Sequence, residues 1–226
     1  MRYSDETLAR YTAKALDAIQ TASNRLDQLK VHIAKGNRKI GRIRNVSLMS
    51  RVCCGNCRTC EHYCYDIKAA LQYKTVMTAR AENTALARGN RIEYFGQIAS
   101  SMTPRCKRKA FRFHVGGEIL DEAYLRGMIW IALRRPDWRI WTYTKMYDIV
   151  NRYVQNYGII PANLSIMYSA DSNAVVENPY CFPIAWTVLE GEEEPRDKMK
   201  CPGNCEECYE NGYGCPFGDS VYFLEH

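Results

Sequence analysis

The strongest chemical signal in the sequence is the grouping of its cysteines. Nine of the eleven cysteines fall in two short segments: Cys53, Cys54, Cys57, Cys60 and Cys64, then Cys201, Cys205, Cys208 and Cys215. In a reducing compartment, clustered thiols indicate metal or redox chemistry and not structural disulfides. Thiolates are soft ligands that suit zinc and iron–sulfur clusters. Both segments are therefore candidate metal sites.

Two ligand spacings overlap within the first segment. Cys53, Cys57 and Cys60 follow C-x3-C-x2-C. Cys54, Cys57, Cys60 and Cys64 follow C-x2-C-x2-C-x3-C, the run found in bacterial ferredoxins. Zinc also accepts four thiolates. The spacing alone leaves open both the register and the choice between zinc and an iron–sulfur cluster.

The second segment repeats the pattern of the first. Residues 201–208 read C-P-G-N-C-E-E-C, parallel to C-C-G-N-C-R-T-C at residues 53–60, and Cys215 supplies a fourth thiol. The two segments can build two neighbouring centres, the second being a cluster or a zinc site, or they can share one centre. The spacing does not decide between these arrangements.

The rest of the chain alternates between strand and helix patterns. Apolar residues at three-to-four-residue spacing predict one long helix over residues 5–34. Six strands are expected at residues 43–48, 110–115, 139–143, 164–168, 182–189 and 221–224. Helices are expected at residues 65–88, 91–101, 120–134, 146–157 and 172–176. Alternation of this kind predicts parallel strands joined by crossover helices.

This pattern predicts an α/β fold, an open and partial (β/α)6 barrel. Residues 1–40 form an N-terminal helical extension in this prediction, and residues 41–226 form the barrel. Residues 190–219 are polar and cysteine-rich. We therefore expect an irregular segment there that is held together by metal, and not a helix.

A Gly-Gly-Glu sequence follows the second expected strand. Two glycines at a strand end allow a ligand to approach the backbone closely. The carboxyl ends of parallel strands meet at one rim in barrel folds. We therefore expect Gly116, Gly117 and Glu118 to lie near the first cysteine segment.

These residues resemble the radical S-adenosylmethionine superfamily. The resemblance implies that Cys53, Cys57 and Cys60 hold a [4Fe–4S] cluster and that the segment Gly116–Glu118 lies against bound S-adenosylmethionine. It also implies reductive cleavage of the sulfonium by the cluster, followed by hydrogen abstraction from a substrate.

The chain also resembles the phage and mobile-element gene product 88 family. The matching pieces are Cys54, Cys60 and Cys64-Tyr65, the sequence FRFHVGGE, the sequence WTYTK at residues 141–145, the late cysteine-rich segment and the terminal strand. In the register that this resemblance implies, the cluster ligands are Cys54, Cys60 and Cys64.

The leading hypothesis is a cytoplasmic iron–sulfur protein that acts as a radical S-adenosylmethionine enzyme. The N-terminus lacks the pattern of a signal peptide, and no apolar run is long enough for a membrane span. The alternative is a non-catalytic protein with structural zinc or iron–sulfur, which binds a protein partner or binds nucleic acid through basic residues 35–44 and 105–112. The net charge of +6 is modest. Substrate and oligomeric state stay open.

Overall fold

The fold is built on one parallel β-sheet. The computed structural model describes residues 2–55 and 60–224. Within them the sheet has seven strands in the order β1-β2-β3-β4-β5-β7-β6, and every adjacent pair is parallel. The strands are β1 (Arg44–Val46), β2 (Ala110–Phe113), β3 (Arg139–Thr144), β4 (Leu164–Ala170), β5 (Ile184–Val188), β6 (Met199–Lys200) and β7 (Val221–Leu224).

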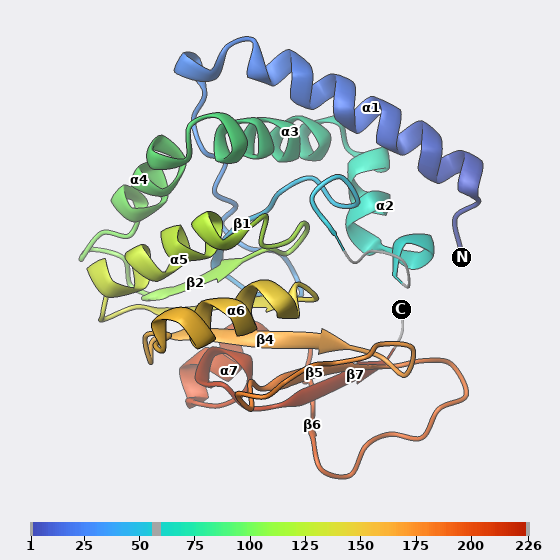
Figure 1. The fold of residues 1–226 in the computed structure, drawn as a ribbon, viewed down its shortest axis with the longest axis vertical. Helices are drawn as coiled ribbons and strands as arrows, with labels where there is room; N and C mark the ends of the chain where they lie inside the picture. Colours follow the sequence, from blue (N-terminus) through green and yellow to red (C-terminus); the bar gives the residue numbers. More distant parts are fainter. Residues whose placement is uncertain (1, 56–59, 225–226) are drawn as a thin grey trace.

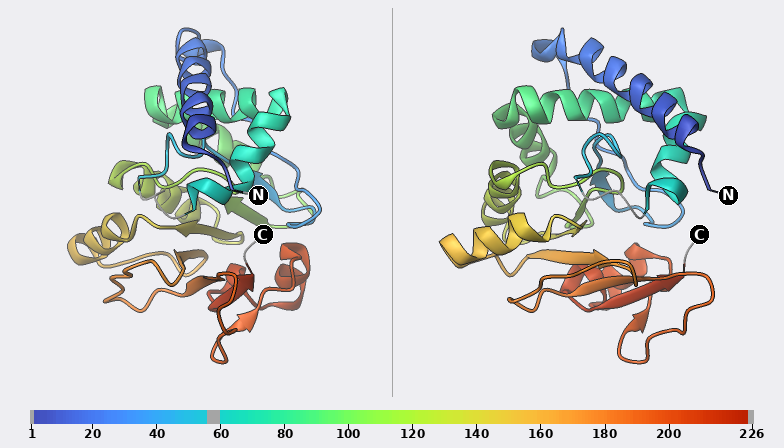
Figure 2. Two further views of the ribbon diagram at one scale, coloured as in Figure 1. Left: turned by 90° about the vertical axis from the view of Figure 1, so that its right-hand side faces the viewer. Right: turned by 45° about the vertical axis from the view of Figure 1, so that its right-hand side comes forward.

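Seven α-helices accompany this sheet in the described part of the chain. They are α1 (Asp5–Ser23), α2 (Tyr65–Gln72), α3 (Lys74–Gly89), α4 (Arg91–Ser101), α5 (Glu122–Arg134), α6 (Tyr147–Tyr157) and α7 (Cys205–Asn211). Short 3-10 helices occur at η1 (Leu26–Gln28), η2 (Glu61–Tyr63) and η3 (Cys215–Phe217). Figures 1 and 2 show α1 lying against α3 at one end of the molecule, with α7 at the other.

The sheet has two differently covered faces, because successive strand residues point to opposite sides. On β2, Phe111 and Phe113 join the main core, which also contains residues of α1, α3, α4, α5 and α6. Ala110 on β2 and Trp141 on β3 join a second, smaller core with residues of α7 and η3. The α7 side of the sheet is called the inner face below.

The strand predictions are confirmed for six strands, but the strand number was wrong. The expected six-stranded arrangement lacked β6, which pairs with β7 inside residues 190–219. That segment also contains α7, contrary to the expectation of no helix. The side chain of Asn204 caps α7 by accepting the amides of Glu206 and Glu207. A two-residue strand and a two-turn helix are too short for a periodic signal.

The prediction of one helix over residues 5–34 was also wrong. Helix α1 ends at Ser23, and the residues between η1 and β1 are not helical. Val31 donates its amide to the side chain of Gln97, and His32 donates its amide to the side chain of Asn83. Tertiary hydrogen bonds thus replace the helical ones.

Two smaller helix predictions need correction as well. The helix expected over residues 65–88 is broken into α2 and α3 at Tyr73, whose φ of −121° and ψ of 112° are extended. Residues 172 and 173 form a turn, and residues 174–176 are not helical. None of the described helices has the length and apolar character needed to cross a membrane.

Two helical glycines provide a matched test of this packing. A Cβ on Gly127 in α5 would lie 2.1 Å from the Phe95 ring, whereas a Cβ on Gly96 in α4 would meet nothing within 4 Å. Gly127→Ala should lower the free energy of unfolding by about 1–3 kcal/mol through overpacking. Gly96→Ala should raise it by roughly 0.5–1 kcal/mol. Denaturant unfolding of both variants checks this; equal effects would contradict the packing of α4 on α5.

Candidate functional site

A cavity of about 600 Å³ opens at the carboxyl end of the sheet. Residues at or just beyond the ends of β2, β3, β4, β5 and β7 line it. The other lining residues come from the loops before and after β1, the first cysteine segment, the start of α2 and the start of the second cysteine segment. A volume of this size suits a small-molecule ligand. Segments that are far apart in the sequence therefore meet around one space.

The first cysteine segment divides between the cavity and the core. Cys54, Cys60 and Cys64 line the cavity. Cys53 does not: it is 6% exposed and belongs to the main core. Its Sγ lies 3.7 Å from Thr84 Oγ1. Cys57, also expected as a ligand, lies outside the described residues.

Cys64 has a distinct electrostatic setting at the start of α2. Burial raises the pKa of its thiol to about 11, while the backbone amides of Asp66 and Ile67 act in the opposite direction. Amides at a helix start favour a thiolate. Metal binding would replace the thiol proton.

The Gly-Gly-Glu segment lies at this cavity, as expected. Gly117 has a φ of 86°. A Cβ on Gly116 would lie 2.0 Å from the Asp66 carboxylate, and one on Gly117 would lie 2.7 Å from Leu48 Cβ. Both positions therefore require glycine for packing. A ligand is not needed to explain the residue type.

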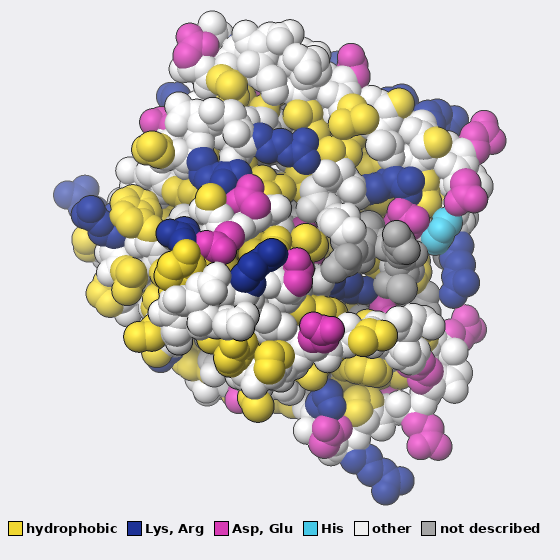
Figure 3. All heavy atoms as spheres, viewed as in Figure 1, with side chains coloured by type: hydrophobic (Ala, Val, Ile, Leu, Met, Phe, Trp, Pro, Cys, Tyr) yellow, Lys and Arg dark blue, Asp and Glu magenta, His cyan; other side chains and the backbone are white. Residues whose placement is uncertain are grey.

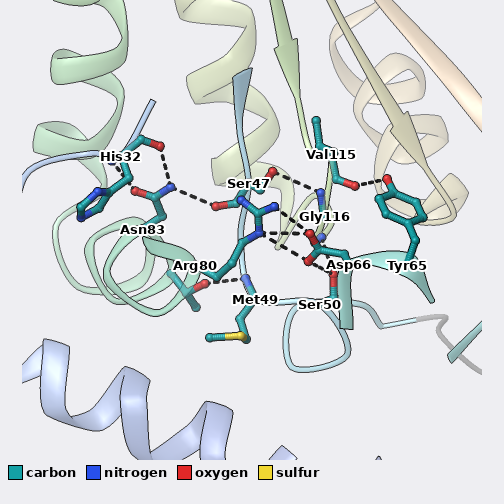
Figure 4. A network of polar contacts seen from close by, with 12 residues as sticks. His32, Ser47, Met49, Ser50, Tyr65, Asp66, Arg80, Asn83, Val115 and Gly116 are labelled. Atoms are coloured by element: carbon teal, nitrogen blue, oxygen red, sulfur yellow. Dashed lines mark hydrogen bonds and ion pairs between the residues drawn. The ribbon is translucent and has the colours of Figure 1, made fainter. Parts of the chain in front are cut away.

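Hydrogen bonds from the loop after β1 hold this glycine pair in place (Figure 4). Ser47 Oγ accepts the Gly116 amide at 3.2 Å, and Ser50 Oγ accepts the Gly117 amide at 3.1 Å. Ser50 in turn donates to Asp66 Oδ2 at 2.7 Å. The two segments thus form one hydrogen-bonded unit.

A buried ion pair fixes this unit to α3. Arg80 Nη2 lies 2.7 Å from Asp66 Oδ1, and Arg80 Nε lies 3.2 Å from the same oxygen. The side chains are 15% and 2% exposed, respectively. Asn83, one turn further along α3, donates to the carbonyl of Ser47 at 3.0 Å (Figure 4).

Glu118 is buried and surrounded by donors. Its carboxylate accepts from Thr144 Oγ1 at 2.7 Å, from the Lys145 amide at 2.7 Å and from the Ile119 amide at 3.1 Å. Burial nevertheless raises its pKa to about 7. Lys145 itself pairs with the buried Asp171 at 3.1 Å. Glu118 thus joins the end of β2 to the end of β3.

The second cysteine segment lies on the inner face. Cys205, Cys208 and Cys215 are buried, and Cys201 and Cys205 line the cavity. Tyr143 Oη on β3 donates to Cys215 Sγ at 2.9 Å. Burial raises the pKa of Cys208 to about 11 and that of Cys215 to about 12, and nearby cysteines contribute in both cases.

Neither segment forms a complete site for a single ion in the described residues, which leave out Cys57. There, no three His, Cys, Asp or Glu side chains are placed to bind one metal ion. Zinc requires four ligands within about 2.0–2.3 Å of one point. A cluster instead distributes its thiolates over several iron atoms.

Sequence reasoning missed the charged residue inside β2. Arg112 is 8% exposed, lines the cavity and stacks on the Tyr143 ring with a centroid distance of 4.5 Å. The available signal was an arginine between two phenylalanines in a buried strand, which places it on the opposite face from them. His114 also lines the cavity, but its two ring nitrogens already bond Thr142 and Tyr124, and burial lowers its pKa to about 3.

The two basic stretches meet acidic side chains of α7. Arg42 and Arg108 both pair with Glu206, and Arg108 also pairs with Glu210. On the face that carries α4, α5 and α6, basic and acidic side chains are interspersed (Figure 3). Binding of nucleic acid stays a prediction.

Comparison with known families gives one match. The gene product 88 family matches residues 7–201. Comparison with the curated proteins gave no match, and comparison with the solved structures gave none either. The matched range includes the whole first cysteine segment, the Gly-Gly-Glu segment and the first cysteine of the second segment.

The buried ion pair predicts a large difference between two aspartate variants. Asp66→Asn leaves Arg80 buried without its counter-charge and should lower the free energy of unfolding by about 3–5 kcal/mol. Asp148→Asn breaks an exposed pair with Arg152 and should change stability little. Thermal and denaturant unfolding measure both. Similar small effects would show that Asp66 does not carry the network.

The carboxyl group of Glu118 should lose its proton at an unusually high pH. Its pKa is raised from 4.5 to about 7, so between these values the unfolded chain is ionised while the folded chain keeps its proton. Stability contributed by the protonated form is therefore lost as pH rises from 4.5 to 7. Carboxyl 13C NMR, with the resonance assigned by its loss in Glu118→Gln, should show a midpoint near pH 7. A midpoint at or below 4.5 would mean that the three donors outweigh burial.

Proposed function

This chain belongs to the gene product 88 family, and from that premise we propose that it is an iron–sulfur protein with its cluster at the carboxyl end of the sheet. The proposed reaction class is that of radical S-adenosylmethionine enzymes on a partial barrel. The observation that carries the proposal is that three thiols of the first segment and Gly116–Glu118 line the same cavity.

The placement of individual thiols supports one ligand register. Cys54, Cys60 and Cys64 line the cavity, whereas Cys53 lies in the core beside Thr84. Moving Cys53 into the cavity would remove a buried side chain from close packing, which is costly. We therefore propose Cys54, Cys60 and Cys64 as the cluster ligands.

The cavity volume of about 600 Å³ and its lining by Gly116–Glu118 support a bound cofactor beside the cluster. Asp66 and Leu48 occupy the space where a Cβ of Gly116 or Gly117 would lie. A cofactor would therefore contact the backbone of these glycines. S-adenosylmethionine bound to a reduced cluster would supply reductive cleavage of its sulfonium. The chain's part is to hold the ligand against the strand ends and to limit its contact with water.

For the second segment we propose a separate, structural iron–sulfur cluster, because in the described residues no three side chains are placed to bind a single zinc ion. Three of its four cysteines are buried between α7, η3 and the inner face of the sheet. Tyr143 donates to Cys215, in the way that outer-shell donors support metal-bound sulfur. Such a centre would link the part of the second segment that lines the cavity to β2 and β3.

Metal analysis of cysteine variants tests the proposal. Anaerobically purified protein should contain iron and acid-labile sulfide and show charge-transfer absorption in the visible range. Serine variants at Cys54, Cys60 and Cys64 should each lose the iron and sulfide of this cluster, because each removes a thiolate ligand, while a cluster at the second segment is retained.

Two other cysteines serve as matched controls. Cys53→Ala should retain the cluster, with lower stability from a small core cavity. Cys181→Ser should change neither, since Cys181 is exposed. Zinc without sulfide in the wild-type protein, or full iron content in all three serine variants, would refute the proposal.

A further inference from the structure

Arg112 is a buried cation whose hydrogen-bonding capacity is largely unused. Its Nε is buried without a hydrogen-bond partner. Its polar contact to another side chain is from Nη1 to Cys205 Sγ, at a long 3.9 Å. In the described part of the chain, no carboxylate lies within ion-pair distance of it. Burying an arginine without a counter-charge costs several kcal/mol.

The Arg112 side chain lies at the cavity. The guanidinium stacks on the Tyr143 ring, and Arg112 is among the cavity-lining residues. Trp141, its register partner on β3, has a buried Nε1 that also lacks a partner. A guanidinium carries donors alone, so a ligand in the cavity that satisfies Arg112 must be an acceptor.

A second cation lines the same cavity. Lys39 is exposed, and its Nζ lies 5.6 Å from the centre of the Phe223 ring. Phe223, on β7, also lines the cavity. Two cations and an aromatic ring on one side of the cavity resemble, in chemistry, a site for a charged head group.

We propose that Arg112 and Lys39 form an anion-binding subsite that takes a carboxylate or phosphate group of the substrate. This deepens the proposed function and depends on it for the idea that the cavity is a substrate site. A planar guanidinium matches either anion through two parallel hydrogen bonds, while Lys39 adds charge at the solvent side. The anionic group would be held on the inner face, in the cavity that the glycine segment also lines.

The proposal is tested by anion binding to the anaerobically purified full-length protein. The unfolding temperature is measured while sodium phosphate or sodium acetate replaces sodium chloride at constant ionic strength. At least one of the two anions should raise it in a saturable manner, because a ligand that binds only the folded state stabilises it. A response to phosphate alone identifies a phosphate group, and one to acetate alone identifies a carboxylate.

Three variants connect the response to the subsite. Arg112→Gln should weaken binding at least about tenfold, the effect of losing one charge-assisted hydrogen bond of about 1.4 kcal/mol or more. Lys39→Gln should weaken it by a smaller factor, and it tests the proposal even if Arg112→Gln folds poorly, since Lys39 is exposed. Arg126→Gln, which alters an exposed pair with Glu122 on α5, should bind like the wild type.

Three outcomes would overturn the subsite. The first is the absence of any saturable anion response in the wild-type protein, and the second is a response in both Arg112→Gln and Lys39→Gln that equals that of the wild type. The third is loss of metal from Arg112→Gln with unchanged anion binding, which would assign Arg112 to the thiolates of the second segment. Metal content of the wild-type protein judges the proposed function separately, so the two failures are distinguishable.

Discussion

The ion pair between Asp66 and Arg80 is the interaction on which the arrangement of the site depends. Asp66 is the second residue of α2, just after the first cysteine segment, and Arg80 belongs to α3. The carboxylate also accepts a hydrogen bond from Ser50 and occupies the space beside Gly116. One buried carboxylate therefore sets the position of the cysteine loop relative to the ends of β1 and β2. Its burial is tolerated because every part of it has a donor.

The chemistry of the cavity follows from the alternation of side chains along the strands. On β2, Phe111 and Phe113 pack under the helices, so Arg112 must point to the inner face. On β3, Trp141 and Tyr143 point the same way. The outer face thereby receives the hydrophobic core, and the inner face receives the cation, the phenol and the second cysteine segment. Stability and chemistry are carried by opposite sides of the same strands.

Some of this could be predicted from the sequence, and the reasons for success and failure differ. Strands such as β3 and β7 were found because β-branched and aromatic runs are bounded by polar loops. Helix α1 was overextended to residue 34 because Leu29 and Ile33 keep a helical spacing, while the hydrogen bonds that hold that segment come from Gln97 and other distant side chains. Periodicity reports which residues are buried and does not report which distant groups bind the backbone.

At the site, too, some residues could be predicted from the sequence and others depend on the fold. The spacing of the cysteines identified both segments, yet it could not separate Cys53 from Cys54, because adjacent residues differ only in the direction that the fold gives them. Cys53 lies against Thr84 in the core, and Cys54 lines the cavity. Arg112 lies in the basic stretch 105–112 and in the sequence FRFHVGGE, yet neither pattern singles it out from its neighbours. The role proposed for it rests on the fold, which places it at the cavity that Cys54, Cys60 and Cys64 also line.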